Sequence, residues 1–142
     1  MPSLNPAACN CLALRQAARH VTQLYDEFLA PSGIRATQYS ILARLQRNGP
    51  MTINALAAEL VMDRTTLGRN IRPLQRDGLI AVGAGKTDRR SRELSLTPSG
   101  IARCRAARAG WDKAQAKFER AFGAERARAL RALLHDVATT AS

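Results

Sequence analysis

Arginine side chains gather in one stretch of this 142-residue chain. From Asp63 to Arg92 there are eight cationic and three acidic residues, so this stretch holds +5 of the formal net charge of +11. The arginine fork of N–H donors matches phosphate oxygens and guanine edges. Net charge alone is also compatible with a solvated basic surface, but its concentration here favours a polyanionic partner.

Part of this stretch has the periodicity of a helix. Within 64–77 the apolar residues Leu67, Ile71 and Leu74 recur at three- and four-residue steps, which predicts a helix seated on a core. Its interior carries four arginines and no acid, a self-repulsion that is tolerated when the partner is a polyanion. We predict that this helix contacts the base edges of DNA, and that residues before and after it contact the DNA as well. The predicted DNA contacts are Thr52, Arg64, Thr65, Thr66, Arg69, Asn70, Arg72, Lys86, Asp88, Arg89, Arg90 and Arg92.

The next segment has the pattern of a β-hairpin. Residues 79–82 and 93–96 read as strands, and 83–92 is a tip rich in glycine and arginine. Asp88 stands two residues before Arg90 and can hold its guanidinium in a pose suited to a narrow minor groove; an ordinary exposed ion pair is the alternative. Lys86 follows Gly85 as in a phosphate-binding loop, but position 80 lacks the required glycine and a strand follows, which excludes nucleotide hydrolysis.

The elements that must position these side chains are mostly helical. With 26 alanines and only 4% aromatic residues, the composition favours helix, and the 46% apolar content excludes a disordered polyelectrolyte. Thr37, Thr52, Asp63 and Thr97 are the expected N-caps of successive helices. Apolar periodicity predicts helices over 9–30, from Thr37 to Asn48, over 53–60, 64–77, 98–122 and 124–138. The sequence therefore predicts a mainly α, winged helix-turn-helix fold with a two-stranded β-wing.

We expect a single domain over 1–142 in which 35–97 form the winged helix-turn-helix part. The apolar faces of 9–34 and 98–142 exceed what a winged helix of that size can cover. These segments are therefore the predicted dimerisation helices. A two-fold dimer would place its two reading helices about 34 Å apart, one turn of DNA.

The chain resembles the MarR family of bacterial transcriptional regulators over nearly its whole length. The motifs that carry the resemblance are Met62-Asp63-Arg64-Thr65-Thr66-Leu67, Leu74-Gln75-Arg76-Asp77-Gly78-Leu79-Ile80, Asp88-Arg89-Arg90 and Leu94-Ser95-Leu96-Thr97. The resemblance implies a homodimer with intertwined terminal helices, bound to a near-palindromic double-stranded DNA operator. It also implies a regulator that is more often a repressor than an activator.

Members of this family sense a small phenolic or aromatic acid, or an oxidant. The start of the chain resembles the peroxide-sensing OhrR branch, which implies oxidation of Cys11 and a thiolate held by Tyr25. Cys9 is a candidate resolving thiol. The chain departs from that branch where Arg15 and Ala36 replace tyrosines. The alternative is that Cys11 is a small buried hydrophobe and Cys9 a frayed end.

A small-molecule inducer would need a pocket, for which an arginine can supply the carboxylate contact. The candidates are Arg19, His20, Tyr25, Tyr39 and Trp111, each of which is also an ordinary packing residue. With two histidines and a cysteine pair that is too tight for zinc, no metal and no cofactor are expected. Cys104 has no expected role.

Other functional classes have less support. The chain shows no paired carboxylates and no nucleophile–base spacing, so we do not expect an enzyme. A winged-helix module that binds protein or RNA is the alternative to a DNA-binding regulator. The N-terminal residues lack a signal segment and no apolar run reaches membrane-spanning length, so we expect a cytoplasmic protein with reduced thiols and no membrane contact.

Overall fold

The computed structural model describes residues 3–85 and 90–140 and is mainly helical. The helices are α1 (Asn10–Leu29), α2 (Ala36–Asn48), α3 (Ile53–Glu59), α4 (Arg64–Arg76), α5 (Pro98–Phe122) and α6 (Ala124–Thr139). The strands are β1 (Met51–Thr52), β2 (Ile80–Ala84) and β3 (Arg92–Leu96), and the short 3-10 helices are η1 (Pro6–Ala8) and η2 (Ala30–Ser32). The predicted fold class is confirmed.

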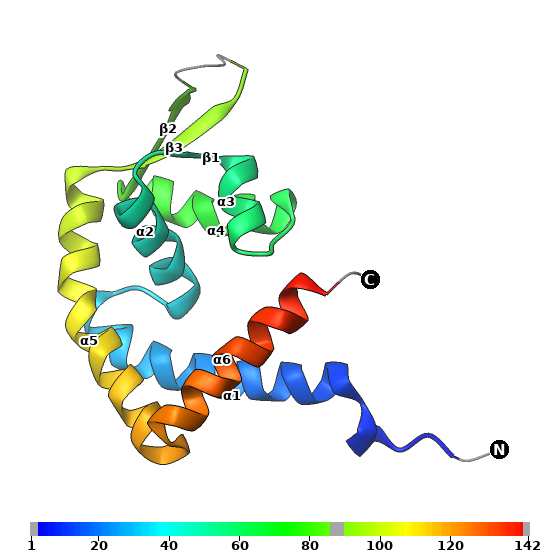
Figure 1. The fold of residues 1–142 in the computed structure, drawn as a ribbon. Helices are drawn as coiled ribbons and strands as arrows, with labels where there is room; N and C mark the ends of the chain where they lie inside the picture. The colour runs from blue at the N-terminus through cyan, green and yellow to red at the C-terminus, as the bar shows by residue number, and fades with distance from the viewer. Residues whose placement is uncertain (1–2, 86–89, 141–142) are drawn as a thin grey trace.

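The elements form two regions joined by the long helix α5 (Figure 1). The sheet and helices α2, α3 and α4 gather at one end of the molecule, and α1 and α6 lie at the other. α5 begins beside the sheet and runs to the far end, where Gly123 separates it from α6. The fold thus separates a winged helix-turn-helix from a pair of terminal helices.

The wing is an antiparallel pair of strands, as predicted. β2 and β3 pair from Ile80 opposite Leu96 to Ala84 opposite Arg92. A third strand, β1, pairs with the other edge of β3, with Met51 opposite Leu94. The sequence did not predict β1, because a two-residue strand is too short to show alternation.

The core lies between the helix-turn-helix, the sheet and α5. Leu67, Ile71 and Leu74 are all buried there, which confirms the predicted apolar stripe of α4. Cys104 of α5 is also in this core, where its thiol donates a hydrogen bond to Gln46 Oε1 over 2.9 Å. The structure therefore gives Cys104 a packing role that its arginine-rich sequence context did not indicate.

Three of the four predicted N-caps are confirmed. Thr52 Oγ1 accepts from the Ala55 amide, and Asp63 and Thr97 accept in the same way from the amides three residues ahead. The prediction for Thr37 was wrong, because α2 already begins at Ala36. The Ala36 amide donates instead to Asp26 Oδ1 of α1 over 2.7 Å. A cap supplied by another helix leaves no local sequence signal.

α1 crosses α5 where the residues of α5 are small. Ala107 and Ala114 are fully buried, and a Cβ on Gly110 would lie 2.3 Å from the carbonyl oxygen of Phe28. The two backbones therefore approach too closely at Gly110 for any side chain.

The terminal helices leave apolar side chains in solvent. Leu133, Leu134 and Val137 of α6 are 63%, 40% and 53% exposed, and Leu12 and Leu14 of α1 are also exposed. No helix within the described residues combines the length and the apolar character needed to span a bilayer.

Candidate nucleic-acid interface

The outward face of α4 is lined by arginine. Thr65, Arg69, Arg72 and Arg76 recur at helical spacing on the side opposite the buried stripe, and all four are exposed. Arg76 lies 3.6 Å from the carboxylate of Asp77. Within the described part of the chain, no ion pair holds Arg69 or Arg72. Their guanidinium groups are therefore available to an external anion.

The N-terminus of α4 is fixed by one carboxylate. Asp63 accepts from the Thr66 amide and from the Thr66 hydroxyl, each over 2.8 Å. The hydrogen bond from the Thr66 amide, followed by the one from its hydroxyl, lowers the pKa of Asp63. Asn70 Nδ2 donates to the Thr66 carbonyl over 2.9 Å. Two of the predicted DNA contacts, Thr66 and Asn70, therefore already use their side-chain donors in hydrogen bonds at the start of α4.

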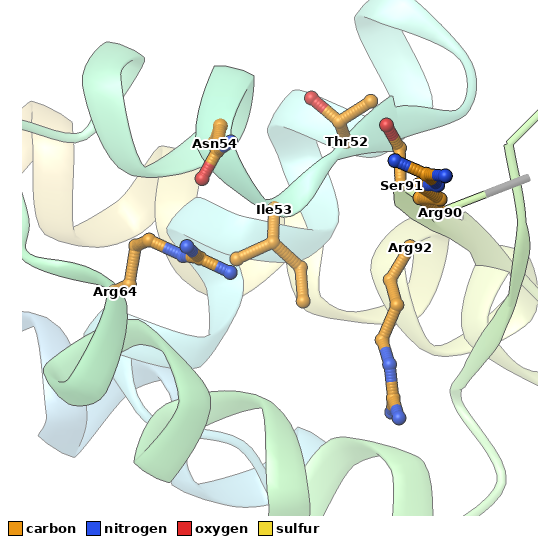
Figure 2. Close-up of a pocket in the computed structure, with 7 residues that line it drawn as sticks. All are labelled: Thr52, Ile53, Asn54, Arg64, Arg90, Ser91 and Arg92. Carbon is orange, nitrogen blue, oxygen red and sulfur yellow. The ribbon is translucent and has the colours of Figure 1, made fainter. Parts of the chain in front are cut away.

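Four of the predicted contacts meet in one cavity, although they come from three separate segments. Figure 2 shows Thr52 beside the start of α3, Arg64 reaching across from α4, and Arg90 and Arg92 arriving from the wing. The cavity measures about 350 Å³ and its lining has no acidic residue. We call it the arginine cleft; its lining residues are Thr52, Ile53, Asn54, Arg64, Arg90, Ser91 and Arg92. Three guanidinium groups around one open space can take an anion such as a phosphate group.

The sequence analysis missed Asn54 and Ser91 of this cleft. Asn54 is the second residue of α3, two positions after a predicted cap, and Ser91 lies between two predicted arginines. That proximity is the only signal that could have found them. The predicted contacts Lys86, Asp88 and Arg89 lie outside the described residues, as does the predicted pairing of Asp88 with Arg90.

The two N-terminal cysteines are both exposed. Cys9 is the N-cap of α1, where its sulfur accepts from the Leu12 amide over 3.4 Å. The alternative of a small buried hydrophobe therefore does not describe Cys11 within this chain. Tyr25 stands fourteen residues further along the same helix, about 21 Å away, and donates a hydrogen bond to Gln115 Oε1 of α5. It is too far to reach Cys11 of its own chain.

The five predicted pocket residues do not share one cavity in this chain. Tyr25, Tyr39 and Trp111 line a pocket of about 220 Å³ between α1, α2 and α5. His20 lines a different cavity of about 510 Å³, beside Phe118 and Phe122. Arg19 lines neither of them. The reason is helical geometry, since Val21, Tyr25 and Leu29 share a face of α1 that residues 19 and 20 do not.

Tyr39 is buried and Tyr25 is partly buried, and both tyrosines stay protonated at neutral pH. Burial raises the pKa of Tyr25 and of Tyr39 above the ordinary value for a phenol. Both hydroxyls are therefore donors. Within the described residues, no cluster of three histidine, cysteine or carboxylate side chains could hold a metal ion.

Comparisons of the sequence and of the structure with known proteins both find transcriptional regulators. The sequence pattern of the MarR family matches residues 32–91. The organic hydroperoxide resistance transcriptional regulator of Bacillus subtilis is 29% identical over 90 residues, which cover 63% of this chain and 61% of that protein. The alignment thus spans about three fifths of the length of this curated relative.

Solved structures match over almost the whole chain. The transcriptional regulator MosR of M. tuberculosis, solved in complex with DNA, is 35% identical with a TM-score of 0.77, covering 93% of this chain and 99% of that one. The PcaV transcriptional regulator of Streptomyces coelicolor, solved with its natural ligand, has a TM-score of 0.86 over the full length of both chains. At 20% identity, the likeness to PcaV shows the fold alone.

Proposed function

This chain belongs to the MarR family of transcriptional regulators, and we propose that it binds a near-palindromic DNA operator as a homodimer and acts as a repressor. The observation that carries the proposal is that two cationic surfaces share one helix. The outward arginine face of α4 begins at Thr65, and the preceding residue Arg64, the first of α4, lines the arginine cleft. A duplex placed against α4 would therefore also meet the cleft.

The two surfaces suit different parts of DNA. The α4 face carries Thr65, Arg69 and Arg72, which would enter the major groove, where arginine reads guanine. The cleft would hold backbone phosphates between Arg64 and the wing residues Arg90 and Arg92. Lys86, Asp88 and Arg89 remain predicted contacts of the wing in the adjacent minor groove.

The proposal of a dimer draws on the terminal segments 9–34 and 98–142. The exposed leucines and valine of α6, and the exposed leucines of α1, are a surface that an isolated subunit would leave in water. A second copy offers the same surface, as two-fold symmetry requires. Residues 35–97 would then be the DNA-binding part of each subunit.

We propose that a signal releases the protein from DNA by one of two routes. In the first, a small aromatic or phenolic ligand enters near Tyr25, Tyr39 and Trp111. In the second, an oxidant attacks Cys11, with Cys9 as the resolving thiol, since both thiols are exposed. Tyr25 would have to act on Cys11 of the partner subunit, given its distance along α1.

The DNA proposal is tested by fluorescence anisotropy with labelled duplex from the neighbouring intergenic region, after footprinting has located a protected inverted repeat. We expect Arg69→Ala to weaken binding at least tenfold, because it removes a contact from each half-site. Arg120→Ala is the matched control, because Arg120 is an exposed arginine two residues before the C-terminal end of α5, and this variant should bind like the wild type. Equal affinities for all three proteins, or a preference for RNA, would instead support the alternative interaction module.

The oxidation route has its own test. Treatment with an organic hydroperoxide should release the wild type from DNA but not the Cys11→Ser variant. Equal release of both proteins would remove Cys11 from the mechanism.

A further inference from the structure

One residue of the arginine cleft carries a hydroxyl group that can be modified. Ser91 lines the cleft between Arg90 and Arg92 in the chain, and it is half-buried. It lies in a bend immediately before β3, which begins at Arg92. Because bends at the surface are where modifying enzymes gain access to a chain, the Ser91 hydroxyl is within reach of such an enzyme at the edge of a cationic site.

The cleft around Ser91 is cationic on several sides. Figure 2 shows Arg90 beside Ser91, Arg92 from the start of β3, and Arg64 reaching in from α4 on the opposite side. None of the residues that line the cleft is acidic, and within the described residues neither Arg64 nor Arg92 forms an ion pair. An anion introduced at this point therefore meets guanidinium groups and no competing carboxylate of the lining.

The cleft also offers neutral donors and enough room for an anion. Thr52 Oγ1 accepts from the Ala55 amide over 3.1 Å, which leaves the hydroxyl proton of Thr52 to donate. The side-chain amide of Asn54 lies in the same lining. The volume of about 350 Å³ is within the range of small-molecule sites, so a phosphoryl group attached to Ser91 fits inside.

We propose that Ser91 is a phosphorylation site and that the arginine cleft holds the phosphoryl group of the same chain. In the transfer, Ser91 Oγ forms a bond with the γ-phosphorus of a nucleoside triphosphate, the bond to the leaving diphosphate breaks, and the hydroxyl proton passes to a base of the kinase. A protein kinase that selects serines by neighbouring positive charge fits a serine that stands between two arginines. The product offers three acceptor oxygens to Arg64, Arg90 and Arg92.

Phosphorylation of Ser91 closes the cleft to DNA. The attached phosphoryl group has an effective concentration in the millimolar range, and it takes the guanidinium groups that a backbone phosphate of DNA needs. Its own negative charge repels the DNA backbone. This consequence rests on the proposed function, whereas the capture of the phosphoryl group by the cleft does not.

Phosphorus NMR of the full chain, with phosphoserine introduced at position 91 by codon suppression, measures the capture. The second pKa of a phosphoserine is about 6, and we expect it to be lower by about one unit in the folded chain, because guanidinium groups favour the dianion. The same sample in urea gives the unfolded value. Arg64→Ala should remove a large part of the shift. Arg105→Ala is the matched control, because Arg105 is an exposed arginine of α5 outside the cleft, and it should keep the whole shift.

The NMR measurement can also contradict the inference. Equal pKa values in the folded chain and in urea would mean that the cleft does not hold the phosphoryl group. The same shift in the Arg64→Ala and Arg105→Ala variants would mean that the guanidinium groups of the cleft are not its cause. Either result overturns the inference.

Reaction with a kinase is a separate measurement. An arginine-directed serine kinase and ATP should label the wild type but not Ser91→Ala, and peptide mass spectrometry locates the label. Absence of label from Ser91, or equal labelling of both proteins, overturns the assignment of Ser91 as the modified residue.

Anisotropy with the labelled intergenic duplex tests the effect on DNA binding. Phosphorylation at Ser91 should weaken binding by about tenfold or more. Phosphorylation at Ser99 is the matched control, because Ser99 is exposed in the first turn of α5 and outside the cleft, and it should change the affinity little. Equal DNA affinity with and without phosphate on Ser91 refutes the regulation. A captured phosphoryl group in a protein whose unmodified form does not bind DNA refutes the regulator alone.

Discussion

At the scale of single residues, the carboxylate of Asp63 stabilises the N-terminus of α4 by accepting two hydrogen bonds from Thr66. Its pKa is lowered by hydrogen bonds that exist only in the folded state. A lowered pKa in the folded state means that the stabilisation is present above the unfolded pKa, near 4, and is lost as the pH falls through the folded value.

The first prediction follows from that sign. In Asp63→Asn the amide still caps the helix, so stability at neutral pH should change little, but its fall in acid should be shallower than in the wild type. Urea unfolding at a series of pH values between about 5 and 2 measures the difference. Parallel curves for the two proteins would show that Asp63 does not contribute to the acid sensitivity.

Val61 is a residue whose backbone conformation does not suit its side chain. It lies in the turn between α3 and α4 with a φ of 54°, and its side chain is 69% exposed. A β-branched residue is strained in the left-handed region. We predict that Val61→Asn and Val61→Gly each raise the free energy of unfolding by about 1 kcal/mol. Chemical denaturation measures this, with Val61→Ile as the control that keeps the strain, and a loss of stability in both variants would contradict it.

At the scale of elements, the crossing of α1 and α5 depends on a glycine. A Cβ at position 110 would collide with the Phe28 backbone, which cannot move as the end of a side chain can. We predict that Gly110→Ala lowers the free energy of unfolding by about 1–3 kcal/mol. Gly68→Ala on α4 is the matched control, because a Cβ there meets no atom within 4 Å and alanine favours helix by about 1 kcal/mol. Thermal or urea unfolding of both variants should therefore give effects of opposite sign.

The elements also show what the sequence could predict. Helix boundaries and the caps by Thr52, Asp63 and Thr97 were predictable, because each cap acts over only three residues. The cap of α2 by Asp26 was not, because it comes from another helix. The cationic surfaces show the same difference between features that a few neighbouring residues determine and features that only the fold brings together.

The exposed arginine face of α4 was predictable because its arginines follow one helical period, whereas only the fold brings Thr52, Arg64 and Arg92 together in the cleft. The cavity of about 400 Å³ that Arg44 and Arg108 line had no local signal in the sequence, since these two residues are neighbours only through the packing of α2 on α5.

At the scale of the whole molecule, the proposed binding of a two-fold dimer to DNA would have a measurable consequence for the salt dependence of the affinity. Each phosphate contact releases condensed counterions, so the logarithm of the affinity falls with the logarithm of the salt concentration by about 0.9 per contact. In a dimer, every substitution removes two symmetry-related contacts. Arg92 is a suitable probe because it lines the arginine cleft and, within the described part of the chain, forms no ion pair.

We predict that Arg92→Ala reduces the magnitude of the salt slope by about 1.8, twice the value for one contact. Anisotropy titrations over a range of salt concentrations give the slopes of the wild type, of Arg92→Ala and of the control Arg120→Ala, which should match the wild type. A reduction of about 0.9 would mean that one subunit contacts the DNA through this cleft. An unchanged slope would mean that the cleft does not hold phosphate, and the role of the wing would then have to be assigned to base contacts.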